Sequence, residues 1–268
     1  AFYGWLLGKP VAAERLPAAV QSFIRYQSDR SQELPDVPFQ MLTALGLKQE
    51  EWAQVALRGG WQMVRMNLNT FARHGVFDEP GMAELIAQRL RDPLQIAKAR
   101  VFPYQLLIAF TMAAANEKIP AVVTNALQHA MEIATENVPQ LSGKIYVFPD
   151  VSGSMQSPVT GVRAGATSTV RCVDVAALVA ATVLRKNADA EVIPFESSAV
   201  EIRLNPYDSV MTNANRLANL PFGGTNCSAP LEFLNQRNAK GDLVIYVSDN
   251  ESWIDAPHYG RFGGSATA

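Results

Sequence analysis

Residues 144–155 read Lys-Ile-Tyr-Val-Phe-Pro-Asp-Val-Ser-Gly-Ser-Met. The apolar run that ends at Pro149 is typical of a buried strand, and Asp150, Ser152 and Ser154 follow it directly. In an open α/β sheet, ligands bind outside the carboxyl ends of the strands, and small oxygen donors gathered there suit a hard cation such as Mg²⁺. This stretch therefore indicates an α/β sheet with a metal site at the end of one strand.

Two later segments offer further oxygen ligands. Thr225 lies in the turn Gly223-Gly224-Thr225, just before a helix-like stretch, and residues 243–249 form a second apolar run that ends in Asp249. Taken singly, each segment also fits ordinary helix capping and turn chemistry. Their order along the chain, Asp/Ser/Ser, then Thr, then Asp, favours one shared site.

This order resembles the metal-ion-dependent adhesion site of von Willebrand factor A (vWA) domains. In that family the serines and the threonine bind the metal directly or through water, whereas the two aspartates act mostly through water. The resemblance implies a metal site made of Asp150, Ser152, Ser154, Thr225 and Asp249. Mg²⁺ is the favoured cation, with Ca²⁺ or Mn²⁺ as alternatives, because Mg²⁺ is seldom enclosed by protein alone and leaves a position for a partner's carboxylate. Such a site suits binding rather than turnover.

The spacing of apolar residues along the chain changes near residue 140. Residues 1–140 show helical apolar spacing broken by prolines and glycines, which predicts about six to eight helices in a solenoid or bundle, although no repeat of fixed period is visible. Residues 141–268 alternate strands and helices, which predicts a largely parallel sheet with helices on both faces. The expected strands are 144–149, 190–195, 199–204 and 242–248, and the expected helices are 172–187, 209–220 and 228–238.

The composition limits the classes of protein to consider. The 268 residues are 48% hydrophobic and 18% charged, as in a globular protein with a substantial core. The only cysteines, Cys172 and Cys227, indicate reduced thiols and a cytoplasmic protein. No apolar run reaches about 18 residues and no signal peptide is visible, so no membrane association is expected. The start without Met and the loop-like last residues predict a fragment at both ends.

Two stretches of the helical half narrow the family. Residues 61–71 read WQMVRMNLNTF, and residues 97–109 read AKARVFPYQLLIA. This pair, followed by a vWA-type domain, resembles the TROVE module of the Ro autoantigen family and its bacterial relatives, which also carry a first loop much like residues 148–155. The likeness runs along most of the chain. It implies a HEAT-like α-helical ring segment followed by a doubly wound, Rossmann-like α/β vWA domain.

The same resemblance implies a function. Proteins of the Ro family bind small noncoding Y RNAs on the outside of a monomeric ring of helical repeats and thread single-stranded ends of misfolded RNAs through its centre. In bacteria they work with an exoribonuclease, polynucleotide phosphorylase, in RNA decay and quality control. The chain is then expected to be an RNA-binding adaptor and not an enzyme.

Charge does not select the RNA surface, because residues 1–140 contain 13 Lys or Arg and 13 Asp or Glu. Phosphate binding needs clustered positive charge, so only local patches could serve. Each candidate also fits the plainer reading of a solvated helix face or a cap. The RNA-binding candidates are Arg65, Asn67, Asn69, Arg73, His74, Lys98 and Arg100, of which Arg65, Arg73 and His74 are expected on one helix.

Two other functions stay open at this point. One is a metal-dependent vWA protein-interaction module on a helical scaffold, without an RNA role. The other, weaker one is a metal-dependent hydrolase. It lacks a visible nucleophile and base, because His74, His129 and His258 lie far apart in the sequence.

Overall fold

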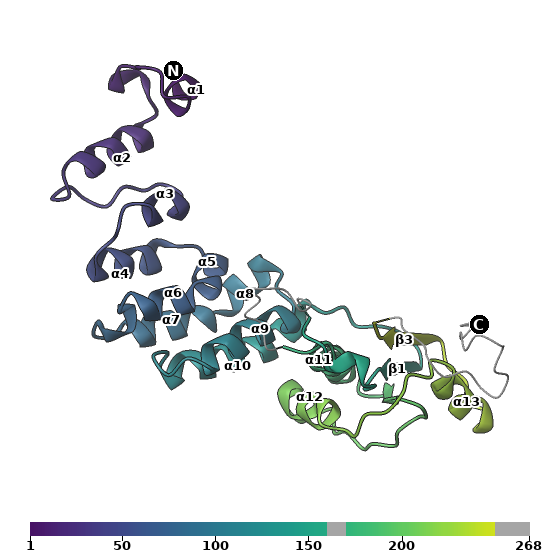
Figure 1. Ribbon diagram of the computed structural model, residues 1–268. Coiled ribbons are helices and arrows are strands. Elements are labelled where there is room, and N and C mark those ends of the chain that lie inside the picture. Colours follow the sequence, from purple (N-terminus) through teal and green to yellow (C-terminus); the bar gives the residue numbers. More distant parts are fainter. Residues whose placement is uncertain (160–169, 250–268) are drawn as a thin grey trace. The chain divides into compact units, whose positions relative to one another are not determined.

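The computed structural model describes residues 1–159 and 170–249 (Figure 1). The chain divides into two compact units, Ala1–Ile86 and Ala87–Ala268. The expected boundary at residue 140 separates two family modules, a TROVE-type module and a vWA-type domain. It is a different boundary from the one between the two compact units, and it stays a prediction. No helix in the described ranges is long and apolar enough to cross a membrane.

The first unit is entirely helical. Its helices are short because prolines and glycines interrupt the apolar spacing at Pro17, Pro38 and Gly60, each of which is the residue before a helix. The elements are α1 (Phe2–Leu6), η1 (Ala13–Arg15), α2 (Ala18–Ser28), α3 (Phe39–Thr43), α4 (Gln49–Arg58), α5 (Trp61–Met66), α6 (Leu68–Arg73), η2 (Val76–Asp78) and the start of α7 (Met82–Leu90).

Trp52 of α4 organises the core of the first unit. It is 4% exposed, and its indole meets the edges of Phe39 and Phe71 at centroid distances of 6.3 and 6.4 Å. The imidazole of His74 stacks on the same indole at 4.4 Å with an interplanar angle of 15°. One aromatic side chain therefore holds together segments that come from α3, α4 and α6.

The expectation that Arg65, Arg73 and His74 lie on one helix is wrong, since the structure divides this stretch at Asn67 into α5 and α6. Asn67 has φ −115° and ψ 15°, outside the helical range, and its side-chain amide donates to Met63 O over 2.8 Å. A side chain that bonds to nearby backbone competes with helix continuation in this way. Together with other short helices, this break gives ten α-helices before residue 140 instead of six to eight.

The second unit begins with three helices that lead into the sheet. They are α8 (Pro93–Ala99), α9 (Pro103–Ala114) and α10 (Ala121–Ala134), followed by η3 (Thr135–Asn137). Helix α10 packs on α8 and α9, and α9 also packs on α11 (Cys172–Lys186). The helices that precede residue 140 and those that follow it thus share a core within this unit. A closed ring of helical repeats stays a prediction.

A three-stranded parallel sheet in the order β2-β1-β3 forms the centre of the described α/β part. Its strands are β1 (Ile145–Pro149), β2 (Glu191–Val192) and β3 (Leu243–Val247), with Tyr146 opposite Glu191 on one side and Val244 on the other. The parallel sheet expected from the alternation of strands and helices is confirmed. Every residue of the central strand β1 is buried, as in parallel sheets with two covered faces.

Helices cover both faces of the sheet. Side chains alternate along a strand, so Tyr146 and Phe148 share a face with Ile193 and Phe195, and Leu234 of α13 (Ala229–Gln236) closes that cluster. Helix α11 packs against β1 from the other side, and α12 (Val210–Ala218) packs on α11. Helix α11 begins where the Asp174 carboxylate accepts from the Arg171 N–H over 2.8 Å, and ends with the basic pair Arg185 and Lys186.

Two of the expected strands differ in the structure. The strand at 190–195 shortens to Glu191–Val192, although Phe195 keeps an isolated parallel bridge to Asp150. The strand at 199–204 does not form, and only Ala199 makes an antiparallel bridge, to Phe195. Alternating polar and apolar residues alone do not make a strand, because the backbone groups need a paired neighbour along their length.

Candidate functional site

Asp150 is the centre of the candidate metal site. It follows β1 directly, is fully buried, and donates its backbone N–H to Val247 O of β3 over 2.9 Å. Its Oδ1 accepts from the Ser152 N–H over 2.9 Å, and its Oδ2 accepts from Ser248 Oγ over 2.7 Å. The carboxylate is thus fixed at the carboxyl end of the central strand β1, next to the end of β3.

The two serines of the first loop lie next to this carboxylate. Ser152 is fully buried and Ser154 partly buried, and their hydroxyl oxygens are 3.2 Å apart. The loop is held by a hydrogen bond from the Val151 N–H to Phe195 O over 2.9 Å and by burial of the Met155 side chain, which is 3% exposed. The two hydroxyls of this loop therefore lie within hydrogen-bonding distance of each other.

The second loop is bonded to the first. The Gly153 N–H donates to Gly223 O over 2.9 Å, and Thr225, two residues further on, is 2% exposed. The loop that follows β2 holds this arrangement, because Ser197 Oγ accepts from the Gly224 N–H over 3.0 Å and Glu196 O accepts from the Asn226 N–H over 2.8 Å. The hydroxyl of Thr225 is thereby carried on a loop anchored to the Ser152–Ser154 loop.

Glu196 gives this region a negative charge. Burial raises the pKa of its carboxyl, but hydrogen bonds from Ser197 and Ser198 outweigh burial and lower that pKa below its usual value. The Ser198 hydroxyl donates to Glu196 Oε1 over 3.2 Å. The carboxylate therefore stays ionised at neutral pH beside the loop that carries Thr225.

Asp249 follows β3 and is exposed among the described residues. It lies close enough to Cys172, the first residue of α11, to influence that thiol: burial first, and the charge of Asp249 second, raise the pKa of Cys172. Ser248, its neighbour, bonds to Asp150. Asp249 thus lies between the end of β3 and the start of α11. His258 lies outside the described residues.

The donor set fits a hard cation. In the described part of the chain, the hydrogen bonds to the Asp150 carboxylate come from neutral groups, a backbone N–H and a hydroxyl. Buried charges in proteins are normally paired or bound to a metal. Carboxylate and hydroxyl oxygens are ligands that Mg²⁺ accepts. The described residues contain no cluster of three or more His, Cys, Asp or Glu suited to a metal, so a cation here depends on the hydroxyls of Ser152, Ser154 and Thr225.

Ser248 and Ser197 are site residues that the sequence reasoning missed. Each had a positional signal, because Ser248 ends the run of β3 and Ser197 comes just after the run at 190–195. Residues at the carboxyl ends of neighbouring parallel strands meet at one edge of the sheet. Their actual partners, Asp150 and the Gly224 N–H, depend on the strand order and could not be read from the sequence.

The residues predicted to contact RNA fall into both units. In the first unit Arg73 is exposed and Asn69 half-buried, His74 stacks on Trp52, and the amide of Asn67 is bonded to Met63 O. Arg65 is only 8% exposed, with its guanidinium 6.0 Å from the Trp61 ring centroid, and burial lowers its pKa. Little of Arg65 is left for a phosphate. In the second unit Lys98 and Arg100 are exposed.

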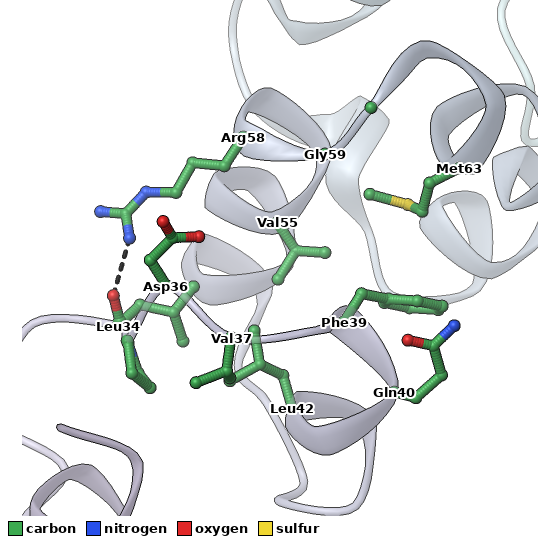
Figure 2. Close-up of a pocket in the computed structure, with 12 residues that line it drawn as sticks. Leu34, Asp36, Val37, Phe39, Gln40, Leu42, Val55, Arg58, Gly59 and Met63 are labelled. Atoms are coloured by element: carbon green, nitrogen blue, oxygen red, sulfur yellow. Dashed lines mark hydrogen bonds between the residues drawn. The ribbon is translucent and has the colours of Figure 1, made fainter. Parts of the chain in front are cut away.

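The first unit also contains a cavity of about 310 Å³ between α3 and α4 (Figure 2). Val37, Leu42 and Val55 form an apolar wall, and Arg58 lies at one end. The guanidinium of Arg58 donates to Leu34 O over 2.7 Å and to Glu33 Oε1 over 2.9 Å. That cation is therefore engaged in holding the segment before α3 against α4.

Comparisons with known proteins bear on both halves of the chain. Residues 144–259 match the family model described as the Ro60 vWA domain. The chain is 28% identical over 204 residues to the RNA-binding protein RO60 of Deinococcus radiodurans and 26% identical over 204 residues to that of Caenorhabditis elegans. These alignments cover 72% and 73% of this chain.

A solved structure shares the fold. The crystal structure of the Deinococcus radiodurans RO (RSR) protein matches with a TM-score of 0.70 and 22% identity over 90% of this chain. The chain spans 37% and 30% of the two sequence relatives and 48% of the crystallised chain. The match therefore includes helices as well as the α/β part, and it covers less than half of each relative.

Proposed function

The chain is similar to the bacterial Ro-like proteins and carries a Ro60-type vWA domain, and from this premise we propose that it is part of an RNA-binding adaptor. The observation that carries the proposal is the match of residues 144–259 to a vWA domain specific to Ro60. Metal-binding loops of the vWA type alone would not point to RNA. Their combination with helices that match the same relatives favours RNA over other vWA functions.

The finer features of the proposal follow the resemblance. The RNA ligands are small noncoding Y RNA and the single-stranded ends of misfolded RNA, and the protein partner is an exoribonuclease such as polynucleotide phosphorylase. The protein acts as a monomeric ring in the cytoplasm and contributes no catalytic step. Three exposed cations could meet phosphate, namely Arg73 of α6, Lys98 of α8 and Arg100, which follows α8.

The metal site forms a second part of the proposal. Ser152, Ser154 and Thr225 would hold Mg²⁺ by their hydroxyls, with Asp150 and Asp249 supplying negative charge. When bound, the cation offers a position to a carboxylate of a partner. Hydrogen bonds within the chain orient the ligand oxygens. Ser248 and the Ser152 N–H hold the Asp150 carboxylate, and Ser197 holds the loop that carries Thr225.

The test is a filter-binding titration of the complete natural protein with a structured small RNA that bears a single-stranded 3′ end. It is run at two salt concentrations, with and without Mg²⁺. Tight binding that weakens with salt is expected, since each phosphate contact releases counterions. An Asp150→Asn variant separates the two parts of the proposal, because it should lose the cation and keep the RNA contacts of the helices. Absence of RNA binding under every condition would refute the adaptor function and leave a protein-binding vWA module.

A further inference from the structure

Phe102 and Tyr104 form an exposed aromatic pair at the start of α9. Phe102 is 41% exposed and Tyr104 39% exposed, and their rings are nearly parallel, with 6.4 Å between centroids and 11° between planes. Two nearly parallel rings at the surface offer a flat apolar face to a ligand. Neither residue belongs to the metal site.

The backbone that carries this pair is well fixed. Asn137 of η3 donates its side-chain amide to Val101 O over 2.8 Å, and the Phe102 N–H donates to Gln105 Oε1 over 3.0 Å. Pro103 is the first residue of α9, where its fixed φ suits the helix. The rings therefore project from a rigid helix start rather than from a loose loop, which lowers the entropic cost of binding.

A cavity of about 290 Å³ adjoins the two rings. Its other walls are Val138, the residue that follows η3, and apolar side chains of α11, together with Thr182, whose hydroxyl already donates to Leu178 O over 2.7 Å. The walls thus offer ring faces and methyl groups and hardly any hydrogen-bonding groups. The lining residues are Phe102, Pro103, Tyr104, Val138, Leu178, Val179, Thr182 and Val183.

The chain segment that leads to the two rings carries an excess of positive charge. The segment 87–104 contains four cationic residues, Arg89, Arg91, Lys98 and Arg100, and one acidic residue, Asp92. Asp92 caps α8 and accepts from the Leu94 and Gln95 N–H groups, so the helix start already balances part of its charge. Arg100 precedes Phe102 by two residues, which places their Cα atoms within about 7.6 Å.

We infer that Phe102 and Tyr104 bind an unpaired base of single-stranded RNA, with Lys98 and Arg100 on the neighbouring phosphates. Stacking on aromatic rings beside a positively charged surface is how single strands are bound without sequence reading. The inference rests on the proposed RNA-binding function and assigns it a place in the second unit. Because the cavity walls are mostly apolar and the phenol of Tyr104 is one of few hydrogen-bonding groups on them, binding there is expected to discriminate little between bases.

A peptide is the other conceivable occupant. An apolar peptide would find the same walls but would gain nothing from the excess of cations in residues 87–104, whereas a nucleic acid gains from both. The charge therefore favours RNA.

The experiment uses the complete natural protein and two probes of equal length, single-stranded oligouridylate and a fully paired RNA duplex. The variants are Phe102→Ala/Tyr104→Ala and Phe102→Leu/Tyr104→Leu, of which the second keeps apolar bulk and secures the fold. Tyr207→Ala is the matched control, because Tyr207 is 80% exposed and lies outside this site. Both double variants should bind oligouridylate about tenfold more weakly, as for the loss of one stacked base, and should bind the duplex unchanged. An oligonucleotide with 4-thiouridine should cross-link to Phe102 or Tyr104.

The outcomes separate the inference from the function on which it rests. If the unaltered protein binds neither probe, the proposed function fails and the inference with it. If it binds oligouridylate and both double variants bind as well as Tyr207→Ala, the inference is wrong and the RNA-binding function stands. Equal losses for the single strand and the duplex would also overturn it, since stacking requires an unpaired base. Unchanged RNA binding with loss of a protein partner would assign the cavity to a peptide.

Discussion

The hydroxyl of Ser248 donates to Oδ2 of Asp150 over 2.7 Å, although the two residues are 98 positions apart in the chain. They meet because β3 pairs with β1 in parallel, with Pro149 opposite Val247. The bond leaves Oδ1 of Asp150 to the Ser152 N–H. A carboxylate held at both oxygens has one orientation, which is what a site for a small cation requires.

Replacing Asp150 by Asn should abolish Mg²⁺ binding, because the buried charge that attracts the cation is lost while the shape of the side chain is kept. Ser248→Ala should weaken Mg²⁺ binding about tenfold through the freed carboxylate oxygen. Isothermal titration of the complete protein with Mg²⁺ measures both. The matched control is Asp189→Asn, an exposed aspartate of the same unit, which should bind normally. Unchanged affinity in Asp150→Asn would refute the site.

Gly223→Ala should disturb the metal site more than Gly153→Ala. A methyl group on Gly223 would overlap Oε2 of Glu196 and lie 3.1 Å from Ser197 Oγ. The hydroxyl of Ser197, which accepts from the Gly224 N–H and so anchors the Thr225 loop, would therefore have to move. At Gly153 the nearest atom is Gly223 O at 3.4 Å, an ordinary contact. We expect Mg²⁺ affinity to fall several-fold in the first variant and little in the second. The same titration compares them, and equal effects would contradict the role of Ser197.

Thr225→Val should lower Mg²⁺ affinity about tenfold without lowering the melting temperature much. Valine has nearly the volume of threonine, and the site is 2% exposed, so no cavity is left while the hydroxyl ligand is lost. Thr212→Val on α12, whose hydroxyl is 2.8 Å from Ser209 Oγ, serves as the control for loss of a hydroxyl elsewhere. A Thr225→Val variant that binds Mg²⁺ normally would remove this residue from the ligand set.

Arg73→Ala should affect RNA binding, whereas Arg65→Ala should affect stability. Arg73 is exposed, so its loss should weaken RNA binding and reduce the salt slope by about one unit. Arg65 is 8% exposed, so its loss should instead destabilise the first unit by about 1–3 kcal/mol through lost packing. Filter binding at two salt concentrations and thermal melting distinguish the two. Arg73→Lys should restore the salt slope, and a slope unchanged in Arg73→Ala would move the RNA surface elsewhere.

Glu51 should make stability depend on pH in the acid range. Burial raises the pKa of its carboxyl, but the hydrogen bonds from the Tyr26 hydroxyl and the Lys48 N–H outweigh burial and lower it. A lowered folded pKa gives stability that is complete above the unfolded value, about 4.3, and is lost as the pH falls through the folded value. Glu51→Gln should cost about 1 kcal/mol at pH 7 and nothing well below pH 4. Urea unfolding of both proteins across this pH range tests the prediction. A difference in the free energy of unfolding that does not change with pH would contradict it.

The local pattern of the sequence predicted most elements of the α/β part. Helix α11 at 172–186 and strand β3 at 243–247 lie within one residue of the expected 172–187 and 242–248. Their apolar residues follow a pattern that fits one type of secondary structure only. The strand expected at 199–204 was wrong, since a strand depends on pairing that its own residues do not encode. In the same way, the bond from Asn67 to Met63 O divided a helix whose apolar spacing was continuous.

The candidate ligands can be named from the sequence, because their chemistry depends on the apolar runs and glycine turns beside them. These residues are Asp150, Ser152, Ser154, Thr225 and Asp249. How the loops are joined depends instead on the tertiary structure. The strand order β2-β1-β3 brings Ser248 to Asp150, and the bond between Gly153 and Gly223 joins two loops that are 70 residues apart. It also decided which cations and rings reach the surface, since burial of Arg65 and exposure of Phe102 depend on packing between helices. Local chemistry is a property of neighbours in the chain, whereas proximity and burial are properties of the whole fold.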